Sequence, residues 1–138
     1  MSSCTLLCID DQSHLLEHRK AMLESHGFGV RIGSSTYAAM KILEETTVDA
    51  VLVEYKKEGI DAEAIAYHIK QRFPHLPIVL LSAYSDMPQR ILWLVDEFVM
   101  TSELERLIHI IRQTIVRLAG KKRMVSCQVP RNLARAAS

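Results

Sequence analysis

Five short apolar runs alternate along the chain with segments of helical periodicity. They span residues 5–9, 29–32, 50–53, 78–81 and 97–100. The first, third and fourth are continuously apolar, which is typical of strands covered on both faces. Strands that alternate with helices form βα units, and right-handed crossovers then build a parallel sheet. The sequence therefore predicts an α/β fold with a doubly wound, five-stranded parallel sheet.

The segments between these runs carry apolar residues at helical spacing. The predicted stripes are Leu15, Met22 and Leu23; Tyr37, Met40 and Leu43; Ile65, Ile69 and Phe73; and Leu104, Leu107, Ile108, Ile111, Ile115 and Leu118. Asp61 is a suitable N-cap for the third of these helices, which cannot continue through Pro74. Ser102 and Glu105 have capping-box spacing at the start of the last helix. We expect these helices to cover both faces of the sheet.

Size and composition indicate one globular domain. The chain has 138 residues, of which 49% are hydrophobic and 24% charged. No apolar run approaches the roughly 18 residues of a membrane span, and the N-terminus lacks the pattern of a signal peptide. Cys4 and Cys8 are too far apart along one strand to bridge each other. We therefore expect a cytoplasmic protein with no membrane segment.

Charge is divided unevenly along the chain. Residues 1–116 carry 11 Lys and Arg against 16 Asp and Glu, whereas residues 117–138 carry six basic residues and no acid. We divide the chain into a domain over residues 1–118 and a basic C-terminal extension over residues 119–138. A basic arm can bind nucleic acid or an acidic partner, or it can be a solvated or self-docking extension. Because no aromatic residue accompanies these basic residues, we favour a solvated or self-docking extension and do not expect a nucleic-acid partner.

Several polar residues follow the predicted strands. Asp10 and Asp11 come after the first strand, Glu54 after the third, Ser82 after the fourth and Thr101 after the fifth. In a doubly wound sheet, function is expected at this edge. Converging carboxylates raise one another's pKa, recruit a cation or find a basic partner, and an oxygen-rich pocket suits Mg²⁺. Asp10 and Asp11 could equally be caps of the first helix.

The order of these motifs resembles the receiver domain of bacterial two-component response regulators. The similarity spans about residues 4–118 and rests on the acidic pair that ends Cys8-Ile9-Asp10-Asp11, the turn over residues 54–62 and the segment over residues 75–85. The resemblance implies a flavodoxin-like sheet with strand order 2-1-3-4-5. It also implies that Ser82 and Phe98 stand at the two positions through which the family transmits phosphorylation.

Two positions depart from the receiver pattern. In a working receiver, the resemblance implies an Asp nucleophile after strand three, Mg²⁺ on the acidic pair and a Lys after strand five. This chain has Glu54 at the first position and Thr101 at the last. Phosphoryl transfer depends on placement and on charge neutralisation, so we expect ordinary phosphorylation to be absent. Lys56 or Lys57 could pair with Glu54 as a substitute cation, or be solvated; Asp10 and Asp11 would bind Mg²⁺ weakly, if at all.

The function expected from the sequence is that of a phosphorylation-independent signalling module, without catalytic output, that binds a regulatory protein. The segment between Ser82 and Phe98 is shorter than the family's, which predicts a short helix four. Trp93 in that helix would lie either in an interface or in the core. A homodimer through helix four, strand five, helix five or the C-terminal extension is also expected.

Two alternatives remain for the function. The first is a receiver that accepts phosphate in a phosphorelay. The second is a zinc peptidase, because His14-Leu15-Leu16-Glu17-His18 matches the H-x-x-E-H pattern. That spacing places two imidazoles on one helical face, with Glu17 as a general base. Such peptidases are generally much larger, and we give this alternative little weight.

Overall fold

The computed structural model describes residues 4–56 and 58–128, except for the side chains of residues 13–15 and 118–128. The elements are β1 (Thr5–Ile9), α1 (Ser13–Ser25), β2 (Gly29–Gly33), α2 (Thr36–Glu45), β3 (Ala50–Glu54), α3 (Ala62–Arg72), β4 (Ile78–Ser82), α4 (Gln89–Leu94), β5 (Glu97–Met100), the 3-10 turn η1 (Thr101–Glu103) and α5 (Leu104–Gln128). The alternation of strand and helix predicted from the sequence is confirmed.

The five strands form one parallel sheet with the order β2-β1-β3-β4-β5. This is the doubly wound, flavodoxin-like order that the resemblance implied. The register pairs Ile9 with Val53, Glu54 with Leu81, and Ser82 with Met100. The carboxyl ends of the three central strands therefore lie side by side, and the residues that follow them share one edge of the sheet.

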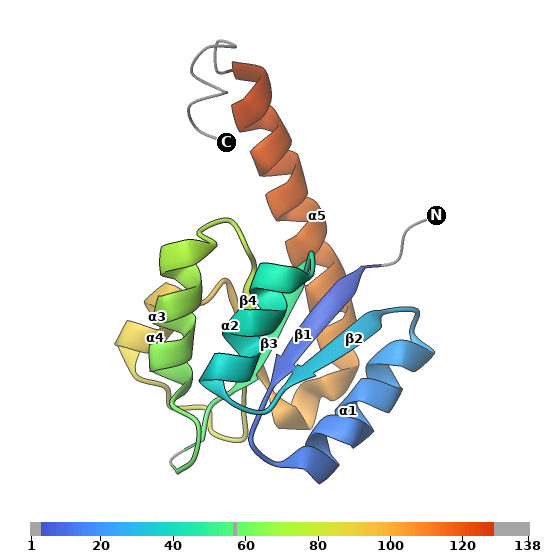
Figure 1. Cartoon of the computed structure of the whole chain (residues 1–138), viewed down its shortest axis with the longest axis vertical. Coiled ribbons are helices and arrows are strands. Elements are labelled where there is room, and N and C mark those ends of the chain that lie inside the picture. The colour runs from blue at the N-terminus through green and yellow to red at the C-terminus, as the bar shows by residue number, and fades with distance from the viewer. Residues whose placement is uncertain (1–3, 57, 129–138) are drawn as a thin grey trace.

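Each face of the sheet has its own hydrophobic core. Side chains alternate along a strand, so Leu6 and Cys8 of β1 face α1 and α5, whereas Leu7 and Ile9 face α2, α3 and α4. Both groups are buried, which explains why β1 is continuously apolar. In Figure 1, α2 crosses in front of the strands and α5 passes behind them.

Some of the predicted helix caps and buried stripes are confirmed, and others are wrong. Asp61 caps α3 by accepting a hydrogen bond from the Ala64 N–H, and α3 ends at Arg72 before Pro74. Ser102 does not start α5 as predicted, because it lies within η1 and α5 begins at Leu104. The inclusion of Tyr37 in the stripe of α2 was also wrong. Its side chain is 76% exposed, and α2 buries Ala39 in its place. The other two residues of the predicted stripe are confirmed, since Leu43 is buried and Met40 packs against the core.

The first and last helices bury most of the predicted residues. In α1, Leu23 is buried and Met22 packs against the core, together with Leu16, which was not predicted. In α5, Leu107, Ile108 and Ile111 are buried, and Leu104 and Ile115 are packed against them. The side chains of Leu15 and Leu118 lie outside the description. The helix continues past residue 118 to Gln128, and residues 129–138 of the basic extension are outside the described part of the chain.

Helix α4 is short, with six residues, as the shortened segment predicted. It packs on the sheet through the buried Ile91, while Trp93 is 78% exposed and Leu92 is 38% exposed. The interpretation of Trp93 as a core residue is therefore wrong. Among the described helices, none combines the length and the apolarity that a bilayer crossing requires.

Candidate functional site

Asp10 is the buried centre of the acidic edge. It follows β1 directly, and its side chain is only 2% exposed. One carboxylate oxygen, Oδ1, accepts a hydrogen bond from Lys56 Nζ at 2.5 Å and another from the Gln12 N–H at 3.2 Å. The other oxygen, Oδ2, is buried without a hydrogen-bond partner among the described residues. A buried carboxylate is costly without a counter-charge, so the ammonium of Lys56 compensates most of this cost.

Lys56 lies between the two acidic residues that follow β1. Its Nζ is 3.7 Å from Asp11 Oδ1 as well as 2.5 Å from Asp10 Oδ1, and its side chain is 17% exposed. The loop that carries Lys56 also approaches Asp11 through Gly59. A Cβ on Gly59 would clash with Asp11 Oδ2, and the φ of Gly59, +98°, is a conformation that other residues rarely adopt. The β3–α3 loop thus packs against Asp11 at Gly59, while the Asp11 side chain stays 37% exposed.

Glu54 has a different partner from the one considered in the sequence. Its Oε1 accepts a hydrogen bond from Arg19 Nη2 of α1 at 3.1 Å, and the two side chains are 13% and 12% exposed. The interpretation that Lys56 pairs with Glu54 is therefore wrong, since Lys56 is engaged by the acidic pair, and Lys57 lies outside the described residues. Arg19 was missed, although its spacing from Leu16 and Leu23 places a cation on the buried stripe of α1.

Ser82 and Phe98 are placed by the two strands on the other side of β3. Ser82 ends β4, is 0% exposed, and accepts a hydrogen bond through Oγ from the Tyr84 N–H at 2.8 Å. Phe98 lies in β5 and packs, half-buried, against the core on the α3 side of the sheet. Thr101 opens η1 immediately after β5 and is half-buried. A threonine hydroxyl carries no positive charge, so it cannot replace a lysine ammonium there.

The arrangement of the acidic residues does not fit Mg²⁺. A magnesium ion takes oxygen ligands in octahedral geometry at about 2.0–2.1 Å, whereas the Lys56 ammonium already lies on Asp10 Oδ1. Glu54 Oε1 is engaged by Arg19 Nη2 at 3.1 Å. Among the described side chains, which leave out those of residues 13–15 and 118–128, no cluster of three or more His, Cys, Asp or Glu is arranged to hold a metal ion. The cations of this site come from the chain itself.

The zinc-peptidase motif is described only in part. Glu17 and His18 are exposed on α1, and the side chain of His14 lies outside the description. Because one of its two histidines lies outside the described side chains, the motif stays a prediction from the sequence.

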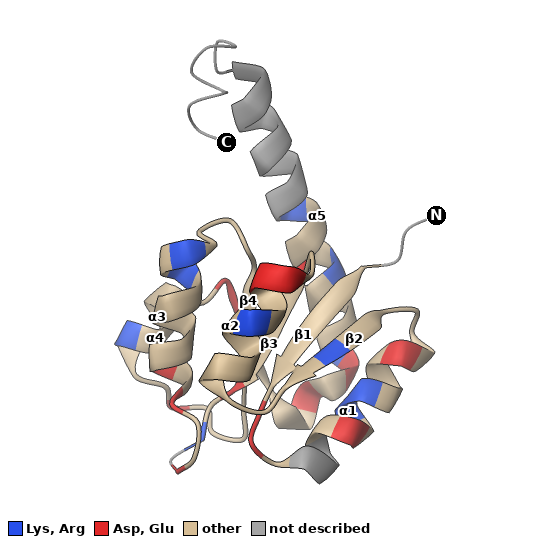
Figure 2. Ribbon diagram, viewed as in Figure 1, with Lys and Arg blue, Asp and Glu red and all other residues tan. Residues whose placement is uncertain are grey.

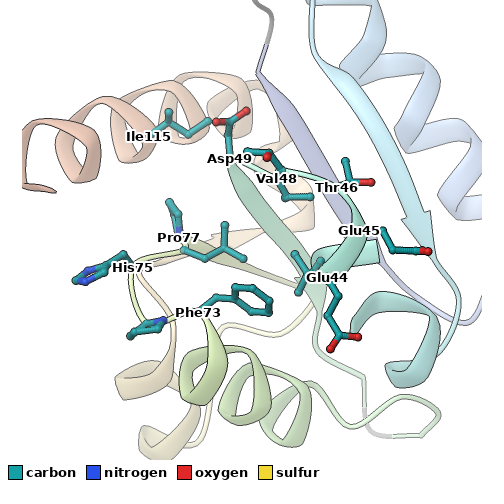
Figure 3. A pocket seen from close by; sticks show the side chains of 13 residues that line it. Glu44, Glu45, Thr46, Val48, Asp49, Phe73, His75, Pro77 and Ile115 are labelled. Atoms are coloured by element: carbon teal, nitrogen blue, oxygen red, sulfur yellow. The ribbon is translucent and has the colours of Figure 1, made fainter. Parts of the chain in front are cut away.

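A hollow lies at the end of the sheet opposite to the acidic edge, between the ends of α2 and α3 and the start of β4 (Figure 3). It has a volume of about 580 Å³, and its apolar lining includes Phe73, Pro77 and Ile115. Two of its acids have partners: Glu44 Oε2 pairs with Arg72 Nη2 at 2.7 Å, and Asp49 Oδ2 accepts a hydrogen bond from the Thr5 N–H at 2.7 Å. Figure 2 shows Lys and Arg interspersed with Asp and Glu over the described helices. Neither observation identifies a ligand.

Comparison with a protein-family model gives a match over residues 6–112 to the response regulator receiver domain. Among curated proteins, the chain is similar to an NtrX-like response regulator of Rickettsia felis, with 31% identity over 86 residues, which covers 61% of this chain and 18% of that protein. It is also similar to the transcriptional regulatory protein GlrR of Escherichia coli, with 26% identity over 86 residues, which covers 62% of this chain and 19% of GlrR. The chain thus spans less than a fifth of these relatives.

Solved structures with the same fold include a CheY-like receiver domain protein from Methanospirillum hungatei. It has a TM-score of 0.76 at 16% identity, and the match covers 87% of this chain and 99% of that one. The response regulator TrrA of Thermotoga maritima gives a TM-score of 0.73 at 24% identity, with coverages of 80% and 98%. NtrX of Brucella abortus gives 0.81 at 17% identity, with coverages of 94% and 31%. At these identities the likeness shows the fold alone.

Proposed function

The chain belongs to the response regulator receiver domain family, and from this premise we propose that it works without phosphorylation, by binding another protein. It is a receiver domain of the two-component type. The proposal concerns how this receiver signals: the fold presents a surface to a regulatory partner, and the acidic edge is a structural element with no catalytic output. A receiver that accepts phosphate is the competing function, and the experiment below separates the two.

The observation that supports the proposal is the ion pair between Glu54 and Arg19. Attack on a phosphoryl group requires a carboxylate in line with it, and a displacement of about 1 Å can cost about 10²-fold in rate. Glu54 is one methylene longer than aspartate, and its Oε1 is held by Arg19 at 3.1 Å. A carboxylate engaged in this way is both displaced and partly neutralised, so it is a poor nucleophile.

The second support is the missing cation after β5. Transferring a phosphoryl group concentrates negative charge that a receiver must neutralise. Thr101 supplies none, and the nearby Lys56 is occupied by Asp10 and Asp11. A phosphoryl group would therefore enter an acidic edge whose own cations are already engaged.

The proposed binding surface is the face formed by α4, β5 and α5. Trp93 on α4 is 78% exposed, and Val116 on α5 is 71% exposed. Arg117 Nη1 of α5 lies 3.8 Å from Glu97 Oε1 of β5. Exposed aromatic and aliphatic side chains of this kind are typical of protein interfaces. The occupant is a regulatory protein or a second copy of the chain. A cytoplasmic location is part of the same proposal, and the free thiols of Cys4 and Cys8 agree with it.

Labelling with acetyl phosphate tests the proposal. We expect the wild type to take no label and Glu54→Asp to be labelled slowly, because the change restores the nucleophile but leaves the phosphoryl charge without its cation. Adding Thr101→Lys should raise the rate substantially. Intact-mass spectrometry at neutral pH measures the acyl phosphate, with Glu54→Asp/Asp10→Asn as the unlabelled control.

An acyl phosphate on the wild type would overturn the proposal and establish a phospho-accepting receiver. Full labelling of Glu54→Asp alone would show that the edge already holds a usable cation. Lys56 is the candidate in that case, because its ammonium lies beside both residues that follow β1.

A further inference from the structure

Among the described residues, the acidic edge contains three carboxylates and two cations. Lys56 pairs with Asp10 and Asp11, and Arg19 pairs with Glu54. The two cations come from different elements, the β3–α3 loop and α1. Counted over these described side chains, the edge has a net charge of one negative unit, which attracts a divalent ion far less than three negative charges would.

We infer that Lys56 is the resident cation of this edge: its ammonium takes the place of a divalent metal ion between Asp10 and Asp11, and it makes the site independent of Mg²⁺. The inference deepens the proposed function, on which it rests, because it names the group that keeps the receiver site closed. The consequence is a latent metal site, which becomes available only when Lys56 is removed.

The first support for the inference is the position of the Lys56 ammonium. One Nζ lies 2.5 Å from Asp10 Oδ1 and 3.7 Å from Asp11 Oδ1, so it bridges two successive carboxylates. Lys56 is attached to the fold and needs no recruitment from solution, whereas Mg²⁺ must shed water to bind. The tethered cation therefore has the advantage at any ordinary metal concentration.

The second support is Asp10 Oδ2, the carboxylate oxygen that accepts no hydrogen bond from the described residues. The Asp10 side chain is 2% exposed, and Oδ2 has no hydrogen-bond partner in the part of the chain that the structure describes. A buried carboxylate oxygen without a partner retains its full capacity to bind a cation. Removing Lys56 would leave both oxygens of Asp10 and Asp11 Oδ1 without a cation at the same edge.

The loop geometry explains why Lys56 is held in place. Gly59 packs so close to Asp11 that a Cβ there would clash with Oδ2. This contact places the β3–α3 loop against Asp11, and Lys56 near the start of the loop reaches both acidic residues. The ammonium and the loop thus close the edge together, and neither requires a bound metal.

Titration with Mg²⁺ tests the inference, since it involves no phosphate donor and no partner. By isothermal titration calorimetry, we expect no binding by the wild type up to about 10 mM Mg²⁺. Lys56→Met keeps roughly the length of the side chain but loses its charge, and should bind Mg²⁺ at least about tenfold more tightly than that limit. Lys56→Met/Asp10→Asn should lose that gain. Lys41→Met is the matched control, because it removes an exposed lysine from α2 and should bind as the wild type does.

The wild type alone also decides the question if Lys56→Met does not fold. Mn²⁺ broadens the amide NMR signals of residues near a bound ion, so Mn²⁺ at the acidic edge would broaden those of Asp10, Asp11 and Gly59. We expect these signals to stay sharp. Selective broadening there, or equal Mg²⁺ affinity in the wild type and Lys56→Met, overturns the inference. Bound Mg²⁺ alone would not make Glu54 accept a phosphoryl group, so the proposed function is still decided by acetyl phosphate labelling of the wild type.

Discussion

The ion pair between Arg19 and Glu54 makes a measurable prediction about stability. Arg19→Met removes the guanidinium and leaves the Glu54 carboxylate, only 13% exposed, without its partner. Breaking a fully buried ion pair by removing one member costs about 3–5 kcal/mol, and hydrogen bonds to charged groups contribute about 1.5–3 kcal/mol. Because both side chains retain some exposure, water can replace part of the interaction. We therefore expect Arg19→Met to lower the free energy of unfolding by about 2 kcal/mol.

The double variant Arg19→Met/Glu54→Met separates the pair from the loss of packing. It leaves no unpaired charge, so it should be less destabilised than the sum of the single variants, with a coupling energy of about 1–2 kcal/mol. Urea denaturation followed by far-ultraviolet circular dichroism measures all four proteins, provided that the dependence of free energy on urea is unchanged.

An exposed ion pair supplies the matched control for this cycle. Arg90 of α4 lies 3.3 Å from Glu63 of α3, with the two side chains 77% and 35% exposed. Arg90→Met should cost less than about 0.5 kcal/mol, because solvent screens such pairs. If Arg19→Met were as harmless as Arg90→Met, or if the Arg19 and Glu54 substitutions were additive, the ion pair would not hold Glu54 as argued.

Three further predictions concern exposed and buried side chains. Trp93→Ala should leave the unfolding free energy nearly unchanged but weaken self-association or partner binding, measured by light scattering and partner titration. Tyr37→Ala, with 76% exposure on α2, is the control, and equal effects of the two would argue against the proposed face. Burial raises the pKa of the Cys8 thiol to about 12, so at pH 8 iodoacetamide should modify Cys4 before Cys8, and rapid modification of native Cys8 would contradict its burial. The measurement uses a Cys127→Ser variant, which removes the third cysteine of the chain. Because the pKa of Cys8 lies above its ordinary value of 9.0, the free energy of unfolding should fall as pH rises from about 9 to 12, and it should fall less in Cys8→Ala.

The fold could be predicted because its signals are local. Strand-length apolar runs and helical periodicity depend on residues a few positions apart, and the structure confirms the strands that they predicted. The strand order, which is not local, was implied by the resemblance to receiver domains and is also confirmed. The errors arose where two signals competed. Tyr37 has the spacing of a buried residue, but the smaller Ala39 packs against Gly33, where a Cβ would lie 3.0 Å from the Ala39 Cα. Close packing of α2 on β2 therefore selects the small residue and turns the tyrosine outward.

The sequence by itself determined the alternation of strands and helices, the edge at which Asp10, Asp11 and Glu54 stand, and the lack of a lysine at Thr101. Only the tertiary structure decided which cation meets which carboxylate. Arg19 and Glu54 are 35 positions apart, and Lys56 and Asp10 are 46 apart. Every carboxylate at the edge attracts every nearby cation, so charge alone leaves the pairing open. The packing of α1 on the sheet brings Arg19 to Glu54, and the turn at Gly59 closes the loop that brings Lys56 to Asp10.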